Sequence, residues 1–279
     1  MLWKGRRQSD NFEDAGRGGG FRIVGGGIGA LVLAVIVYFL GGDPSQILQQ
    51  SIPNQQVTTE TTAKEKEDRE FVSVILAETE DVWNKVFPEK FGAAYREPKL
   101  VTFQQSVASA CGGASSATGP FYCPADEKLY VDLSFYNELR QRFNAPGDFA
   151  MAYVIAHEVG HHIQHLLGVS DKVQKMRGKI SETEYNQLSV RLELQADFYA
   201  GVWAHYAEKT NKILEVGDIE EALNAANAIG DDRLQQQTTG EVVPDAFTHG
   251  TSAQRMYWFK KGYESGNVED GDTFSATTL

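Results

Sequence analysis

One apolar stretch, AYVIAHEVGHHIQHLL over residues 152–167, constrains this chain most, because it holds four of the chain's six histidines and a glutamate. The apolar residues on both sides of the histidines keep helical spacing, which predicts a buried helix over residues 148–167. A buried polar group without a partner costs on the order of 1 to 3 kcal/mol. The stretch therefore predicts that something satisfies the histidines, and a metal ion is a suitable partner.

Within this helix, His157, Glu158 and His161 form the pattern H-E-x-x-H. Residues four apart lie on the same face of a helix, so both imidazoles can reach one Zn²⁺ ion, and Glu158 can hold a water and act as a general base. Five residues match by chance in many proteins, and hydrogen-bonded core histidines are the alternative. The apolar surroundings favour zinc.

A second motif, RLELQADFYAG, offers the third ligand that a catalytic zinc ion needs. Glu193 and Asp197 are four apart on a predicted helix. We expect Glu193 to bind the metal and Asp197 to accept the N–H of a ligating imidazole, which fixes the tautomer of that ring. A solvated helix face is the alternative, but most neighbouring residues are apolar.

Two further histidines in the stretch do not extend this ligand set. A zinc site made of His157, His161 and His165 would span about 12 Å of helix, too far for ligands that bind at about 2 Å. His162 and His165 are therefore predicted to make other hydrogen bonds, and no role follows for His205.

The motif FTHGTSAQR lies just ahead of a predicted helix and contains His249 and Arg255. A donor in this loop can stabilise the oxyanion of a tetrahedral intermediate, which makes His249 a candidate catalytic residue. Arg255 can hold the loop or pair with an acidic group. An ordinary loop histidine is an equally good interpretation of His249.

An uncharged run over residues 23–40 predicts a transmembrane helix over residues 21–40, since eighteen residues at about 1.5 Å each nearly cross a hydrocarbon core of about 30 Å. A buried core helix and a cleavable signal peptide are the alternatives. Five cations precede the run and none follows it until Lys64, which predicts a cytoplasmic N-terminus and an extracytoplasmic or periplasmic catalytic domain.

Composition divides the remaining chain. Residues 1–20 are charged and glycine-rich, which predicts a disordered cytoplasmic tail, and residues 41–62 carry the Pro, Gln, Ser and Thr typical of a linker. We expect one zinc-peptidase domain over residues 63–265 and a flexible tail over residues 266–279. The net charge of −12 argues against nucleic acid as a partner.

The only two cysteines, Cys111 and Cys123, flank a segment of small residues. An oxidising compartment favours a disulfide between them, and a pair of free thiols is the alternative.

The pattern of the domain predicts an α+β fold that is mostly helical. Apolar spacing predicts an amphipathic helix from residue 63, and short β-like runs after Pro98 predict a small antiparallel sheet. One run ahead of the active helix, KLVTFQQ or KLYVDLSF, can bind an extended peptide along its edge. Capping-box spacing predicts that three later helices begin near Ser181, Asp218 and Thr251.

Four motifs together, HEVGHHIQ, ELQADFYAGVWAH, HGTSAQR and the N-terminal GRRQSDNFED before an apolar segment, resemble those of the bacterial "putative neutral zinc metallopeptidase" family of membrane-anchored proteins. The resemblance implies a zincin-type α+β domain. It also implies that His157 and His161 bind zinc, that Glu158 is the catalytic acid and base, and that Glu193 is the third ligand.

The sequence thus predicts a membrane-anchored zinc metallopeptidase that hydrolyses peptide or protein substrates with a zinc-activated water. Two alternatives stay open: a catalytically silent zinc-containing scaffold at the membrane, and a zinc amidase that acts on a non-peptide or cell-wall substrate. The retained Glu158 argues against the scaffold, because a structural zinc site normally closes its fourth position with another side chain.

Overall fold

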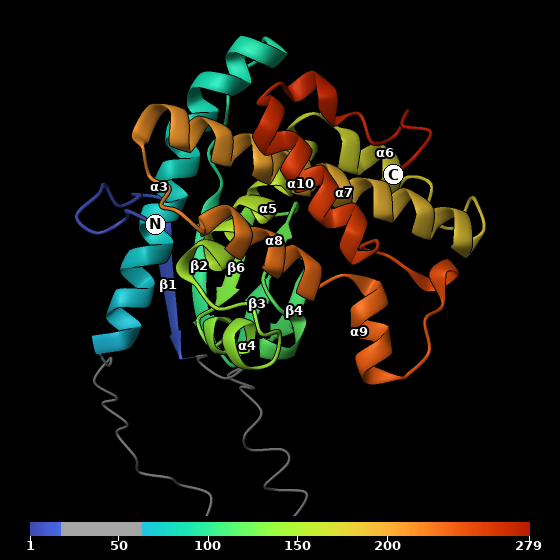
Figure 1. The fold of residues 1–279 in the computed structure, drawn as a ribbon, viewed down its shortest axis with the longest axis horizontal. Coiled ribbons are helices and arrows are strands. Elements are labelled where there is room, and N and C mark those ends of the chain that lie inside the picture. Colours follow the sequence, from blue (N-terminus) through green and yellow to red (C-terminus); the bar gives the residue numbers. More distant parts are fainter. Residues whose placement is uncertain (18–62) are drawn as a thin grey trace, which may run out of the picture.

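A central helix, α5 (Asp148–Leu166), organises the computed structural model, which describes residues 1–17 and 63–279. It is in contact with helices α3 (Ala63–Phe91), α7 (Glu182–Asn211) and α8 (Asp218–Ala228) and with strands β5 (Phe121–Cys123) and β6 (Lys128–Asp132) (Figure 1). Every residue from Phe149 to Gly160 is buried. The predicted buried helix is therefore confirmed, and a helix that is apolar all round is expected only where other elements cover it on every side.

The described elements follow one another in an α+β arrangement that is predominantly helical, as predicted. The strands are β1 (Phe12–Arg17), β2 (Lys99–Gln104), β3 (Ser106–Ser109), β4 (Gly112–Ser115), β5 (Phe121–Cys123) and β6 (Lys128–Asp132). The helices besides α5 are α3 (Ala63–Phe91), α4 (Phe135–Gln141), α6 (Val169–Gln174), α7 (Glu182–Asn211), α8 (Asp218–Ala228), α9 (Asp231–Thr238) and α10 (Ser252–Ser265), with short 3₁₀ turns at Ser116–Thr118, Pro244–Ala246 and Val268–Gly271.

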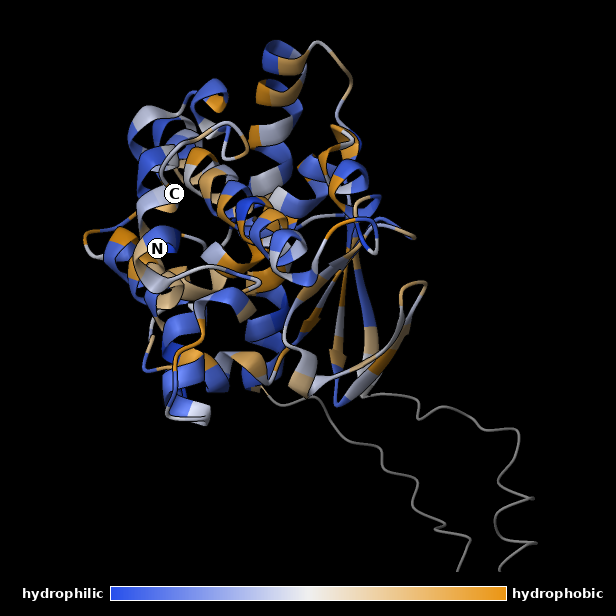
Figure 2. Ribbon diagram, turned by 90° about the vertical axis from the view of Figure 1, so that its right-hand side faces the viewer, coloured by the Kyte–Doolittle hydropathy of each residue, from blue (hydrophilic) through white to orange (hydrophobic). Residues whose placement is uncertain are grey.

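The sheet is mixed rather than antiparallel, which corrects the prediction. Its order is β1-β2-β6-β5, with β1, β2 and β6 parallel and only β5 antiparallel to β6. Strands β3 and β4 form a separate antiparallel hairpin. The strands gather at one side of the helices, with apolar positions recurring along them (Figure 2). β1 can run parallel to β2 because the chain between them, which includes the long helix α3, is long enough for a crossover connection.

This strand order also rules out the predicted peptide-binding edges. The runs KLVTFQQ and KLYVDLSF are β2 and β6, and each already has a neighbouring strand on both sides. Their backbone groups are used within the sheet, so neither can add an extended peptide. Of the described sheet, β1 and β5 are the edges.

The prediction of a disordered tail over residues 1–20 is wrong for residues 1–17. Strand β1 pairs with β2, and Met1 and Trp3 are buried in the main core, where the Trp3 ring packs edge-on against Phe71 at 5.2 Å. The charged composition of this segment predicted disorder, but its large apolar side chains pack against α3, a contact that composition does not reveal.

Strand pairing places residues 12–17 in the same compartment as residues 99–104. The predicted separation of the N-terminus from the catalytic domain by a membrane is therefore wrong. The predicted span over residues 21–40 and the predicted linker over residues 41–62 lie outside the described residues. Within residues 1–17 and 63–279, none of the helices combines the length and the apolar composition of a membrane crossing.

The C-terminal segment, residues 267–279, is docked rather than loose, which corrects the predicted flexible tail. The Thr273 hydroxyl donates to the Arg191 carbonyl at 2.6 Å, and the Arg191 guanidinium donates to carbonyls of Thr273, Phe274 and Ala276. Val268 is buried in the core. Hydrogen bonds from an arginine to backbone carbonyls produce no apolar periodicity in the sequence. The sequence pattern therefore does not predict that this segment packs on α7.

Two of the three predicted capping boxes are confirmed, at Ser181 for α7 and at Thr251 for α10. The third is wrong: Gly217 is the N-cap of α8, and the Asp218 carboxylate instead accepts the N–H of Glu215 at 2.8 Å. The predicted single helix after Asp218 is two helices that meet at Gly230. A side chain at Gly230 would overlap the backbone of Ser252, so α10 approaches the chain there.

Candidate active site

The H-E-x-x-H residues lie on the face of α5 that is turned towards α7 and towards a cleft of about 710 Å³. His157, Glu158 and His161 all line this cleft, and His157 and Glu158 are only 6% and 7% exposed. The chain from Ser116 to Tyr122, which leads into edge strand β5, also lines the cleft. The site is therefore a partly enclosed groove between the helical layer and the sheet.

A close approach of two helices brings the third predicted ligand to the histidine pair. A methyl group added at Gly160 of α5 would lie 2.8 Å from the Ala196 carbonyl oxygen and 2.9 Å from the Ala196 Cα of α7. Only glycine fits at this crossing. Glu193, one turn before Ala196, is thereby carried to the two imidazoles.

The three predicted ligands converge as a zinc site requires. His157 Nε2 lies 3.2 Å from Glu193 Oε2 and 3.1 Å from His161 Nε2, and His161 Nε2 lies 3.4 Å from Glu193 Oε1. Tetrahedral bonds of about 2.0–2.1 Å imply donor atoms about 3.3 Å apart. The His₂Glu set therefore fits zinc in both chemistry and spacing.

The outer nitrogens of both imidazoles are already occupied, which leaves the inner nitrogens for a metal. His157 Nδ1 lies 2.7 Å from Asp197 Oδ1, and His161 Nδ1 lies 2.9 Å from Gln164 Oε1. An oxygen acceptor on Nδ1 places the proton there and leaves the lone pair on Nε2. The predicted contact of Asp197 with a ligand histidine is present in the structure.

Asp197 belongs to a buried charge network at the junction of α5, α7 and α10. It accepts hydrogen bonds from Arg255 Nε at 2.8 Å and from the Tyr153 hydroxyl at 2.6 Å. Burial raises the pKa of the Asp197 carboxyl, but the charges of Arg255 and then His157 oppose it and hold the value at about 2. Asp197 therefore stays ionised, and Arg255 pairs with an acidic group, one of its two predicted roles.

The electrostatics at the centre of the site favour positive charge. Burial lowers the pKa of His157, yet the Asp197 carboxylate and the bond to Glu193 raise it to about 10. Burial raises the pKa of Glu193, but the charge of His161 and the bonds to both histidines hold it well below its ordinary value. A cation between these side chains, a proton or a metal ion, is stabilised by the partly buried carboxylate of Glu193 and, through His157, by the buried carboxylate of Asp197.

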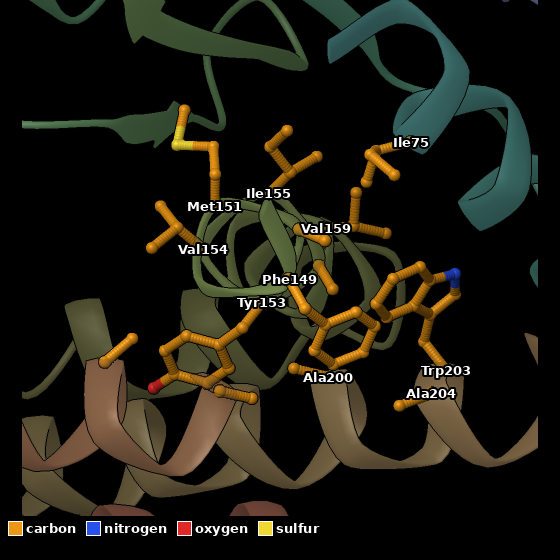
Figure 3. Close-up of a cluster of buried hydrophobic side chains, with 14 of the residues drawn as sticks. Ile75, Phe149, Met151, Tyr153, Val154, Ile155, Val159, Ala200, Trp203 and Ala204 are labelled. Carbon is orange, nitrogen blue, oxygen red and sulfur yellow. The ribbon is translucent and has the colours of Figure 1, made fainter. Parts of the chain in front are cut away.

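Figure 3 views α5 approximately along its axis, with Tyr153 directed towards α7 and Ile155 and Val159 directed away from it. On the α7 side, Ala200 and Trp203 pack against this helix. His157 and Asp197 lie further along the same α5–α7 interface, between the stacked rings of Phe149 and Trp203 and the close contact of Gly160 with Ala196.

His249 also lines the cleft, with an acidic partner that the sequence did not suggest. Its Nδ1 lies 3.1 Å from Asp231 Oδ1, and Asp231 Oδ2 accepts the backbone N–H groups of Thr248, His249 and Gly250. The hydrogen bond to Asp231 raises the pKa of His249 above its ordinary value, and burial opposes this increase. One carboxylate at the start of α9 thus fixes both the loop and the ring.

The remaining histidines take no part in the ligand cluster. His162 Nε2 donates to the Arg96 carbonyl at 2.6 Å, and its Nδ1 accepts from the Tyr122 hydroxyl at 2.9 Å, so this ring makes hydrogen bonds outside the ligand set, as predicted. His165 lies 3.6 Å from Glu127. His205 Nδ1 donates to the Tyr263 carbonyl at 2.9 Å.

Sequence reasoning missed Tyr153, Gly160, Gln164 and Asp231. Helical spacing could have suggested Tyr153 and Gln164, because Tyr153 is four residues before His157 and Gln164 is three residues after His161. Gly160 was visible as an isolated glycine inside a helix, which usually has a packing reason. Asp231 left no signal, since it lies 18 residues before His249 and no helical or strand spacing relates the two.

The disulfide prediction is confirmed: Cys111 and Cys123 are bonded, with their Cα atoms 5.8 Å apart. The bridge closes the segment that contains the cleft wall from Ser116 to Tyr122. It therefore restrains one side of the candidate active site.

An H-E-x-x-H helix with a glutamate ligand from a second helix defines the class of zinc-peptidase-like sites. The family model described as "Putative neutral zinc metallopeptidase" matches residues 1–274, and the chain belongs to this family. It is 50% identical over 285 residues to YpfJ of Escherichia coli strain K12, covering 98% of this chain and 99% of that protein. It is 44% identical over 208 residues to Mb2605 of Mycobacterium bovis, covering 71% of this chain and 68% of that protein. Both relatives carry the name "uncharacterized protein", and no solved structure matches the chain significantly.

The helix crossing generates a prediction. Gly160→Ala must push Ala196 back and carry Glu193 away from the histidines, so we expect a weaker zinc affinity and a loss of about 1–3 kcal/mol in the free energy of unfolding. Urea unfolding of the metal-free protein and zinc competition with a chromophoric chelator measure the two effects. Gly113→Ala is the control, because nothing lies within 4 Å of its added methyl group. Equal values for Gly160→Ala and wild type would contradict the role of this contact.

Proposed function

We propose that this protein is a zinc-dependent peptidase that hydrolyses peptide bonds in the cleft beside α5. The observation that carries the proposal is the convergence of His157, His161 and Glu193 at 3.1–3.4 Å, with Glu158 in the same cleft. The family membership supports the same class of activity. Zn²⁺ is the proposed cofactor, and when bound it supplies the Lewis acidity that polarises a carbonyl and lowers the pKa of a water.

The chain's own residues supply the proton transfers. Glu158 takes a proton from the attacking water and returns it to the leaving amine. Asp197 keeps the proton of His157 on Nδ1, so that Nε2 faces the ligand cluster. His249, held by Asp231, offers its Nε2 to the oxyanion that develops on the substrate carbonyl.

The shape of the cleft supports peptides rather than compact proteins as substrates. Its lining near β5 includes Phe121 and Tyr122, next to a sheet edge. An extended segment of an unfolded or flexible protein fits such a groove. A folded surface has no extended backbone to offer.

Replacement of the proposed base tests the activity. Glu158→Gln should lower kcat/KM on a fluorescently labelled unfolded protein by about 10²–10⁴-fold, because an amide cannot accept the proton of the water. Its zinc content by elemental analysis should stay that of wild type. Glu182→Gln, which removes an exposed carboxylate at the start of α7, is the matched control and should keep full activity. Wild-type protein that binds zinc without cleaving peptide would instead favour the scaffold or the non-peptide amidase.

The pair of Asp231 and His249 predicts a pH dependence. A histidine whose pKa is raised in the folded state contributes stability below its unfolded pKa of about 6.5, and this contribution is lost as the pH rises through the raised value. If protonated His249 stabilises the oxyanion, the alkaline limb of kcat/KM reports that raised pKa.

Asp231→Asn should move this alkaline limb to lower pH, because the hydrogen bond to the carboxylate is the main cause of the raised pKa. Asp232→Asn is the control, since Asp232 bonds Ser252 and not His249. If the alkaline limb of kcat/KM is unchanged in both variants, protonated His249 takes no part in the reaction.

We also propose that the folded unit works in an oxidising, extracytoplasmic compartment, and that residues 21–40 attach it to a lipid bilayer. The disulfide supports the compartment, since such bonds persist mainly outside the cytoplasm. The bilayer contact rests on the apolar sequence alone.

Alkylation of the protein in intact cells tests the compartment. We expect no alkylated thiol and a linked pair of peptides containing Cys111 and Cys123 by mass spectrometry. Alkylation of both cysteines in freshly made, mature protein would place the folded unit in a reducing compartment.

A further inference from the structure

The two histidines of the candidate zinc site are held by different kinds of partner. His157 contacts a carboxylate, which can only accept a hydrogen bond, whereas His161 contacts the neutral amide of Gln164 at 2.9 Å. An amide can present either its oxygen or its nitrogen, and only the oxygen leaves Nε2 of His161 free for a metal. Something must therefore determine which end of Gln164 faces His161.

The surroundings of Gln164 decide its orientation. Gln164 is fully buried, and its Nε2 donates to the Leu192 carbonyl at 2.6 Å and to Gln195 Oε1 at 3.1 Å. A backbone carbonyl is only an acceptor, so the amide nitrogen must point to Leu192 and the oxygen must point to His161.

The second glutamine is fixed in the same way. Gln195 is 6% exposed, and its Nε2 donates to the Gly271 carbonyl at 2.9 Å. Its oxygen is thereby turned to Gln164. The backbone carbonyls of Leu192 on α7 and of Gly271 in the C-terminal segment thus set the direction of the hydrogen bonds that link Gln195, Gln164 and His161.

We propose that Gln164 and Gln195 are positioning residues that hold the tautomer and ring direction of His161, and that the C-terminal segment supports the metal site through them. This proposal rests on the proposed zinc site, but not on peptide hydrolysis. It gives the docked residues 267–279 a role in the site.

The C-terminal segment is held firmly enough for this role. Thr273 and Arg191 bind each other's backbone, and a methyl group at Gly271 would overlap the ring of Phe198 on α7. The Gly271 carbonyl is therefore anchored to the same helix that carries Glu193. The hydrogen-bond partners that orient Gln164 and the proposed ligand Glu193 therefore lie on the same helix, α7.

Zinc affinity of the full chain tests the proposal. Gln164→Met removes all three amide hydrogen bonds at similar volume and should weaken zinc binding about 10–100-fold, the usual cost of losing the outer partner of a ligand histidine. Gln195→Met, which acts one step further away, should weaken it less. Both are measured with zinc alone as the probe, by competition with a chromophoric chelator.

Two further variants separate positioning from general destabilisation. Gln164→Glu keeps an oxygen for His161 and should recover part of the affinity lost in Gln164→Met, although it buries a charge and lowers the melting temperature of the metal-free protein. Thr79→Val removes a buried hydrogen bond to Leu76 in α3, far along the chain from the site, and should lower stability without changing zinc affinity.

Each outcome decides the matter. Wild-type affinity in Gln164→Met, no recovery in Gln164→Glu, or an equal loss in Thr79→Val overturns the positioning role. Zinc binding without peptide cleavage by wild type overturns the proposed peptidase while leaving the positioning role to be judged on affinity. A wild-type protein that binds no zinc overturns both.

Discussion

The contact of α5 with α7 at Gly160 and Ala196 is the constraint on which the candidate site depends. Two imidazoles on one helix can meet a metal ion without help from the fold, but the third donor must come from elsewhere. A glycine at the crossing lets the two backbones approach closely enough for Glu193 to reach 3.2 Å from His157. The ligand triangle is thus a result of backbone packing rather than of side-chain length.

Two buried charged side chains, Asp197 and Arg255, lie next to this crossing. Asp197 and Arg255 are 0% and 3% exposed, and an isolated ion at such a depth is strongly disfavoured. Here the carboxylate is satisfied by Arg255, Tyr153 and His157 together. Such a network is a poor source of net stability, but it fixes geometry, because removal of one partner leaves a buried charge unpaired. That property suits a site in which ring directions matter.

Both ends of the chain belong to this arrangement. Strand β1 closes one edge of the sheet against β2, and the C-terminal segment lies against α7 and reaches Gln195. The sheet in turn carries β5 and the disulfide-closed wall of the cleft. The family match over residues 1–274 agrees with a unit in which neither end is an appendage.

Much of the local structure was predictable, because it depends on residues near one another in the sequence. Apolar spacing predicted the long helices, and apolar side chains of α3 such as Ile75 and Leu76 are fully buried. Capping boxes located the starts of α7 and α10. The candidate ligand residues could be proposed for the same reason, since each motif is a pair of residues four apart on one helix.

The sequence by itself determined which residues are chemically able to bind a metal, and on which helices they lie. Only the tertiary structure decided how those helices cross, that β1 and the C-terminal segment join the fold, and that Asp231 and Gln164 orient His249 and His161. Helix formation depends on residues that are neighbours in the sequence. The helix crossing and the docking of the two chain ends depend instead on contacts between segments up to about a hundred residues apart. How closely two backbones can approach decides these contacts, and this leaves no periodic signal in the sequence.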